Sequence, residues 1–120
     1  MNMKLAEKGY EKVAEKTVEN LVIKKGRCDL ATVALASGAL ELKRGQLLFE
    51  GTGGALAATG TAGKARAILA EDIKADAAGN VTAEVFLSGT FFSTGIVGEL
   101  SDADVDALRA RDIYIQIPAK

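Results

Sequence analysis

The sequence has no histidine and a single cysteine, and these two scarcities exclude several kinds of site. Without imidazole there is no Cys-His pair, no Ser-His-Asp triad and no zinc site of the usual histidine-containing type. One cysteine, Cys28, excludes an intrachain disulfide framework. A lone cysteine among apolar residues is most often a small, partly buried side chain. Any catalytic base would have to be a lysine or a carboxylate, and no spacing around the serines and threonines of 88–94 supports one.

Other residue types and patterns are also scarce. Aromatic residues make up 5% of the chain, tryptophan is absent and the formal net charge is -1. Residues 1–27 carry a balance of +3 and the remaining residues a balance of -4, which is too modest for a nucleic-acid-binding surface. No apolar run approaches the roughly 20 residues that a membrane helix needs. We therefore expect no nucleic-acid partner, no membrane partner and synthesis in the cytoplasm without a secretory signal.

The composition that remains is typical of one small folded domain. The chain has 120 residues, of which 48% are hydrophobic, so disorder throughout is excluded and the core must be mainly aliphatic. Domains of this size often gain stability by oligomerising.

Residues 1–20 differ from the rest, and we predict that they form an N-terminal arm. An imperfect repeat, "AEKGYEKV" then "AEKTVENL", places a lysine and a glutamate in every group of four residues. The spacing permits a helix with a thin apolar stripe, which Gly9 weakens. The segment is expected to be mobile, and helical or extended according to what it contacts. A solvated surface helix is an equally favoured alternative.

Short strands are predicted from residue 29 onward. They cover residues 29–35, 40–51 with a pivot at Arg44-Gly45, 66–73, 81–89 and 90–98. Ser101 and Asp104 then form an acidic variant of the capping box at the start of a short helix. A last strand follows from Ile113 and stops at Pro118. The predicted class is α+β, mainly β: a compact β domain over 21–120 with one short C-terminal helix, preceded by the arm.

Two stretches resemble ligand sites, and neither satisfies the chemistry. "GTGGALAATGTAGKARAI" (51–68) ends like a phosphate-binding P-loop, but Ala58 replaces the first glycine and Ala65 replaces the magnesium-binding hydroxyl. It is interpreted as a mobile connection between strands. Glu71, Asp72 and Asp76 lack the spacing of a calcium loop, and adjacent strand residues point to opposite faces. An acidic strand end is the favoured interpretation, and a weak cation site the alternative.

Several blocks, in this order, resemble the lambda-type bacteriophage head decoration proteins. They are "VENLVI", "VALASGALELKRGQLL", "GKARAILAEDI", "GNVTAEVFLSGTF" and "ALRARDIYI", which together span roughly residues 17 to 117. The most specific parts are Leu42 to Leu48, "AILAEDI", the "SGTF" turn and the "ALR…I-x-I" end. No block is decisive alone; their order and spacing carry the resemblance.

The resemblance implies a capsid accessory protein that uses no cofactor, holds no metal and catalyses nothing. Members form homotrimers on the outside of the expanded head, at threefold and quasi-threefold positions, and clamp neighbouring major capsid subunits. Their N-terminal segment becomes ordered against the capsid. On this basis the capsid-contact residues are hypothesised to be Tyr10, Val13, Val18, Asn20 and Leu21. The lysine- and glutamate-rich arm looks more helical than a simple extended segment, so its conformation stays open.

Two alternatives are kept. One is another phage structural module with a similar β domain, such as a tail or fibre component. The other, from a different class, is a small enzyme or ligand-binding barrel that uses Glu71, Asp72 and Asp76.

Overall fold

The computed structural model describes residues 20–117, which fold into one helix and ten short strands. In chain order the elements are β1 (Val22–Lys25), β2 (Cys28–Leu35), β3 (Glu41–Leu42), β4 (Leu47–Glu50), the 3-10 turn η1 (Thr52–Gly54), β5 (Leu56–Ala57), β6 (Ala65–Leu69), β7 (Ile73–Lys74), β8 (Gly79–Phe86), β9 (Gly89–Phe92), the 3-10 turn η2 (Ser93–Gly95), α1 (Asp102–Arg109) and β10 (Ile113–Gln116). The predicted mainly-β α+β class, with one short helix near the C-terminus, is confirmed. The predicted arm lies outside the described residues, except for Asn20.

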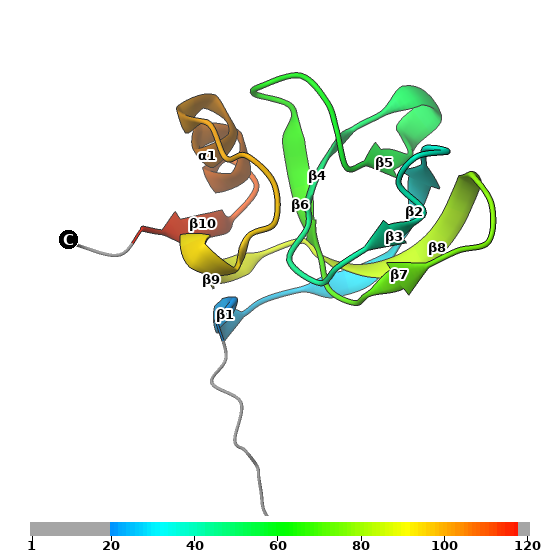
Figure 1. Ribbon diagram of the computed structural model, residues 1–120. Helices are drawn as coiled ribbons and strands as arrows, with labels where there is room; N and C mark the ends of the chain where they lie inside the picture. The colour runs from blue at the N-terminus through cyan, green and yellow to red at the C-terminus, as the bar shows by residue number, and fades with distance from the viewer. Residues whose placement is uncertain (1–19, 118–120) are drawn as a thin grey trace, which may run out of the picture.

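Five strands close into a small barrel in the order β2-β5-β4-β6-β8. The β2–β5 pair is parallel, and the other pairs around the barrel are antiparallel. The long β2–β8 pair runs from Cys28 opposite Phe86 to Leu35 opposite Gly79. Figure 1 shows the barrel on one side of the molecule, and the helix α1 with β9 and β10 on the other. Closure leaves no free sheet edge among these five strands.

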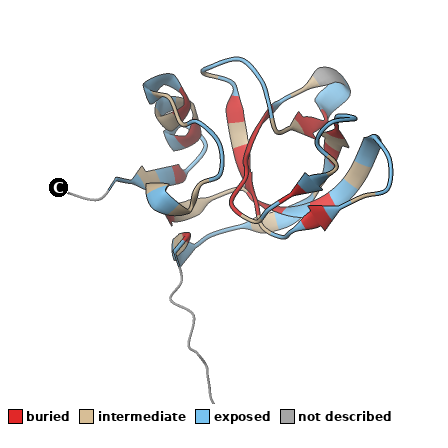
Figure 2. Ribbon diagram, in the orientation of Figure 1, coloured by how far each residue is buried: buried red, intermediate tan, exposed pale blue. Residues whose placement is uncertain are grey.

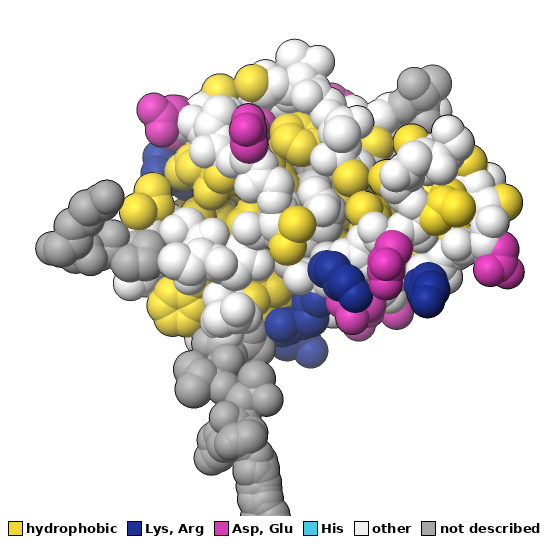
Figure 3. Space-filling view, in the orientation of Figure 1, with side chains coloured by type: hydrophobic (Ala, Val, Ile, Leu, Met, Phe, Trp, Pro, Cys, Tyr) yellow, Lys and Arg dark blue, Asp and Glu magenta, His cyan; other side chains and the backbone are white. Residues whose placement is uncertain are grey.

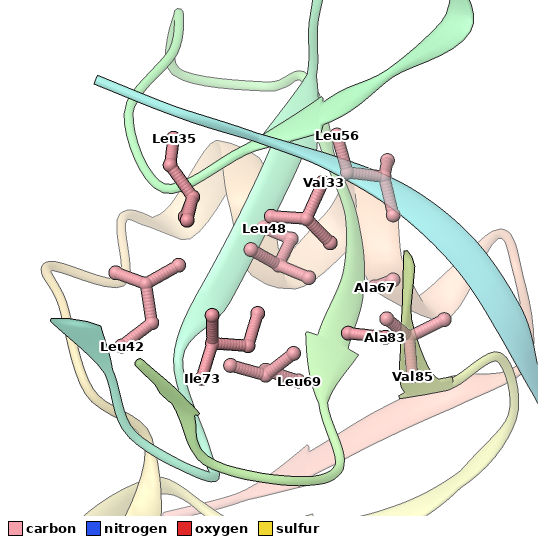
Figure 4. Close-up of a cluster of buried hydrophobic side chains, with 10 residues drawn as sticks. All are labelled: Val33, Leu35, Leu42, Leu48, Leu56, Ala67, Leu69, Ile73, Ala83 and Val85. Carbon is pink, nitrogen blue, oxygen red and sulfur yellow. The ribbon is translucent and has the colours of Figure 1, made fainter. Parts of the chain in front are cut away.

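The barrel interior is filled by aliphatic side chains. Val33, Leu48, Leu69 and Val85 are fully buried there, and Figure 4 shows them pointing toward one another from different strands. Their spacing follows the period of two in β2 and β8, where every second residue faces inward. Side chains from all five barrel strands contribute to this core.

A second core lies between the barrel and α1, β9 and β10. It contains Leu47, Phe91, Leu108 and Ile113, all buried, and Phe86 packs on Phe91 with ring centroids 5.0 Å apart. Figure 2 shows buried residues on these elements as well as on the barrel strands. The helix and the last strand are thus held by apolar burial against the outer wall of the barrel.

The predicted pivot at Arg44-Gly45 is confirmed. Gly45 has a φ of 101°, a conformation that favours glycine, and its backbone bonds to Leu69 and Val97 on either side. The chain turns there from β3 to β4, and β3 pairs with β7 in a separate two-stranded sheet. Just before the pivot the side chains alternate between solvent and core, because Glu41 is exposed and Leu42 is buried.

Three predicted segments were wrong in detail. The interpretation of 51–68 as a mobile connection between strands missed β5, whose Leu56 is buried and which closes the barrel between β2 and β4. The strand expected over 66–73 breaks into β6 and β7, and the strand expected over 90–98 ends at Phe92, where η2 begins. In each case pairing with a distant strand, and not the local pattern, sets where the strand begins and ends.

Replacement of a barrel-core leucine should be far more costly than replacement of a surface one. We expect Leu48→Ala to lower the free energy of unfolding by about 2 to 5 kcal/mol, since it leaves a cavity in a fully buried site. The matched control is Leu30→Ala on β2, where the side chain is 66% exposed, with an expected change within about 0.5 kcal/mol. Urea denaturation measures both. Equal losses would contradict a tightly packed barrel.

Candidate interaction surface

An open three-stranded sheet lies beside the closed barrel, with the strand order β1-β9-β10. β1 runs antiparallel to β9 and β10 runs parallel to it, so α1 lies on the crossover from β9 to β10. Tyr114 is paired with Thr90, and Ile115 with Phe91. Since Phe91 is buried in the second core, Ile115 shares the inner face and Tyr114 lies on the outer face.

This sheet carries exposed apolar side chains at both outer strands. Ile23 in β1 is 41% exposed, Tyr114 in β10 is 46% exposed, and Ile117 just after β10 is 68% exposed. Figure 3 shows hydrophobic side chains at the surface in this region. Among residues 20–117, neither β1 nor β10 pairs with another strand on its outer side. Unpaired strand edges with apolar neighbours are suited to pairing with another chain.

The first described residues, Asn20 and Leu21, contact the end of β9 and the turn η2. The Leu21 carbonyl accepts a hydrogen bond from the Phe92 N–H at 2.8 Å. Gly95 lies so close that a Cβ there would overlap the Asn20 carbonyl oxygen and approach Leu21 Cα within 2.7 Å. Residue 95 must therefore be glycine, because the backbone of Asn20 and Leu21 occupies the space that a side chain would need.

The hypothesised capsid-contact residues have different positions relative to this junction. Tyr10, Val13 and Val18 lie outside the described residues. Asn20 is exposed, but Leu21 is only 1% exposed and packs in the second core. The structure gives the Leu21 side chain a packing role, so a capsid contact through it would require it to leave that core. The contact hypothesis stays a prediction.

The acidic residues Glu71 and Asp72 accept hydrogen bonds from backbone N–H groups. Glu71 accepts a hydrogen bond from the Glu84 N–H at 2.7 Å, and Asp72 accepts one from the Arg44 N–H at 2.7 Å. The two carboxylates thus bond to different segments, and Asp76 is exposed after β7. Across residues 20–117 no group of three or more histidine, cysteine, aspartate or glutamate side chains is placed to hold a metal ion. Asp72 instead stabilises the pivot, a role that the sequence did not reveal.

Asp104 connects the helix to the glycine-rich stretch. The predicted N-cap at Ser101 is confirmed, because the Asp104 N–H donates to Ser101 Oγ at 3.1 Å. The return bond differs from that of a capping box: Asp104 Oδ2 accepts from the Ser101 hydroxyl at 2.8 Å and not from the Ser101 backbone N–H. The other carboxylate oxygen of Asp104, Oδ1, accepts from the Gly63 N–H at 2.7 Å, and Asp104 is 2% exposed. Sequence reasoning assigned Asp104 to capping and solvation and missed the link to residue 63. No local pattern could have indicated a bond across 41 positions.

Cys28 is partly buried at the start of β2 and packs beside the second core. This matches the interpretation of a small, semi-buried residue. In the described part of the chain it is the sole cysteine, and it contributes to packing.

Comparison with known proteins gives no match: no protein-family model matches this chain, and neither does any curated protein. Within 20–117, no helix is long and apolar enough to cross a membrane. What supports a function is therefore the order of the sequence blocks and the geometry of the surfaces described above.

Removal of the Asp104 carboxylate should destabilise the domain. We expect Asp104→Ala to cost about 1 to 3 kcal/mol, because the partly buried Gly63 N–H loses its acceptor and the Ser101 hydroxyl loses the carboxylate oxygen to which it donates. Asp104→Asn should cost less, since the amide oxygen still accepts from Gly63.

The control is Asp106→Ala on the same helix, where an exposed carboxylate pairs with Arg109. We expect a change within about 0.5 kcal/mol there. Thermal and urea unfolding of the three variants measures these differences. A loss at Asp106 equal to that at Asp104 would show that helix charge, and not the link to residue 63, sets the stability.

Proposed function

We propose that this protein is a non-enzymatic capsid decoration protein of a tailed phage. It is synthesised in the host cytoplasm and binds the outside of the expanded head as a homotrimer, at threefold and quasi-threefold positions. There it clamps neighbouring major capsid subunits and stabilises the head. It needs no cofactor for this role.

The observation that carries the proposal is the ordered set of sequence blocks similar to the lambda-type decoration proteins. In the fold, each block falls on a compact piece of the domain. "VENLVI" ends in Val22 and Ile23, the first two residues of β1, and the block over 33–48 runs from β2 into β4. The block over 63–73 forms β6 with the start of β7, 79–91 spans β8 and most of β9, and 107–115 joins α1 to β10. The resemblance thus covers both the barrel and the open sheet.

The geometry is suited to a clamp in two respects. The barrel has a filled apolar interior and closed edges, so it is a rigid body that does not invite further pairing. Within 20–117, no further strand pairs with the outer edge of β10, and Leu21 bonds to Phe92 at the end of β9 in the same sheet. A segment that leaves at such a place is positioned to add a strand to a partner sheet through backbone hydrogen bonds.

Trimerisation would turn weak contacts into lasting attachment. Three arms on one particle bind a repetitive lattice multivalently, so each bound arm raises the effective concentration of the other two. A trimer would also cover part of the apolar surface that a domain of 120 residues leaves exposed.

The alternatives predict different behaviour. A tail or fibre component with a similar β domain would bind a phage particle but not its head shell. A ligand-binding barrel or small enzyme needs a site, and the carboxylates proposed for it bond to two separate backbone segments. No observation of the described residues favours this second alternative over the capsid role.

The decisive test is co-sedimentation with heads. We expect the purified protein to pellet with expanded heads of its own phage, to stay in solution with unexpanded heads, and to have about three times the monomer mass in solution. Analytical ultracentrifugation measures the mass. Failure to pellet with expanded heads would overturn the proposal, and binding to tails instead would favour the first alternative.

Deletion of residues 1–20 should separate folding from attachment. We expect a folded, trimeric core, because the deletion retains Leu21 and every other member that the structure describes of the two apolar cores. Binding to heads should fall strongly, since each trimer loses all three of its N-terminal arms at once. Circular dichroism monitors the fold and co-sedimentation the binding. Loss of folding would show that the segment belongs to the domain core.

A further inference from the structure

Two neighbouring depressions lie between the end of α1 and the barrel strand β6. One is lined by Glu50, residues 63–66, Ala107, Ala110 and Arg111, and the other by Arg27, Ala31, Gly54, Leu56, Arg66, Ala67, Leu87, Ala110 and Arg111. Their volumes are about 440 and 480 Å³. Both share Arg66, Ala110 and Arg111, so they adjoin, and we call them together the α1–β6 groove.

The α1–β6 groove is strongly basic in a chain whose net charge is -1. Arg27, Lys64, Arg66 and Arg111 line it, against one carboxylate, that of Glu50. Glu50 is already paired with Arg66 at 3.1 Å. Within residues 20–117 the other three cations form no ion pair, and all three are exposed. The groove therefore holds more positive charge than its own residues neutralise.

The backbone that carries these cations is held firmly. The Arg27 N–H donates to Ser88 Oγ at 2.6 Å, and the Arg27 carbonyl accepts from the Leu87 N–H at 2.7 Å. The Lys64 carbonyl accepts from the Glu50 N–H at 2.9 Å. The Arg111 N–H donates to the Leu108 carbonyl at 2.9 Å, at the end of α1. Because this backbone is already ordered, binding of an anion would cost little backbone conformational entropy.

The floor of the groove indicates which kind of anion fits. Its accessible apolar lining includes the small side chains of Ala31, Ala107 and Ala110, and no aromatic residue lines it. Single-stranded nucleic acid is usually held by stacking its bases on aromatic rings, which this floor does not offer. Arginine side chains beside an apolar lining are suited to bind side-chain carboxylates, which accept paired hydrogen bonds from guanidinium groups.

We propose that the α1–β6 groove binds an acidic, extended polypeptide segment of a partner protein, with its aspartate or glutamate carboxylates on Arg27, Arg66 and Arg111. This inference goes beyond capsid decoration and does not depend on it, because it rests on the lining of the groove alone. The bound carboxylates take up the positive charge that Glu50 leaves unneutralised.

The test uses a fluorescein-labelled peptide of alternating aspartate and serine, with its asparagine–serine counterpart and labelled oligothymidylate as comparison probes. Fluorescence anisotropy measures binding to the full chain. We expect the aspartate peptide to bind the wild-type protein better than either comparison probe, with weaker binding as salt is raised. The double variant Arg27→Glu/Arg111→Glu should bind it at least about 10-fold more weakly.

The matched control is Lys43→Glu/Lys74→Glu, which changes the net charge equally at β3 and β7, on the side of the barrel away from α1 (Figure 1). Neither lysine lines the groove, so the control should change binding less than about 2-fold. Circular dichroism checks that both double variants are folded.

Four results would overturn the proposal. They are no binding of the aspartate peptide to the wild type, an equal loss in the control, tighter binding of oligothymidylate, and a groove variant that changes the oligomeric mass but not peptide affinity. The last result would identify a second copy of the chain as the occupant. Head binding is measured separately by co-sedimentation, so failure of this inference and failure of the capsid proposal are distinguishable.

Discussion

The strand β4 is buried on both of its faces, and both hydrophobic cores are built on it. Leu48 points into the barrel, whereas its neighbours Leu47 and Phe49 point into the second core. A strand with one solvated face alternates apolar and polar residues. In β4, three consecutive apolar residues pack against the two cores on opposite faces of the strand. The neighbouring strand β6 is buried in the same way, with Ala67 and Leu69 in the barrel core and Ala65 and Ile68 in the second core. These two strands together pack α1 and the open sheet against the barrel, so loss of their packing would loosen the surface that we propose for attachment.

Sequence reasoning succeeded where the physics is local. The Ser101–Asp104 cap depends on residues three apart in one turn of the chain. The turn at Gly45 was predicted because glycine adopts a positive φ without a steric cost. In each case the residues that determine the geometry are neighbours in the chain.

It failed where a distant partner decides. Two residues of β5, inside a glycine- and alanine-rich stretch, have no periodicity, and they form a strand because β2 and β4 leave a gap that closes the barrel. Asp104 and Asp72 looked like ordinary helix and strand-end charges, yet each accepts from a backbone N–H far away in sequence. The α1–β6 groove was equally hidden, since residues 27, 66 and 111 become neighbours only after folding.

The glycine-rich stretch shows how one segment can mimic a site and serve the scaffold instead. A phosphate cradle needs free backbone N–H groups that converge on one point. Here the Gly63 N–H is taken by the Asp104 carboxylate, and the Gly51 N–H by the Ala55 carbonyl at 2.9 Å. Lys64, the residue that made the motif attractive, lies on the rim of the α1–β6 groove. Its charge faces the surface, where a protein carboxylate can reach it, and the functional potential of this domain therefore lies on its exterior.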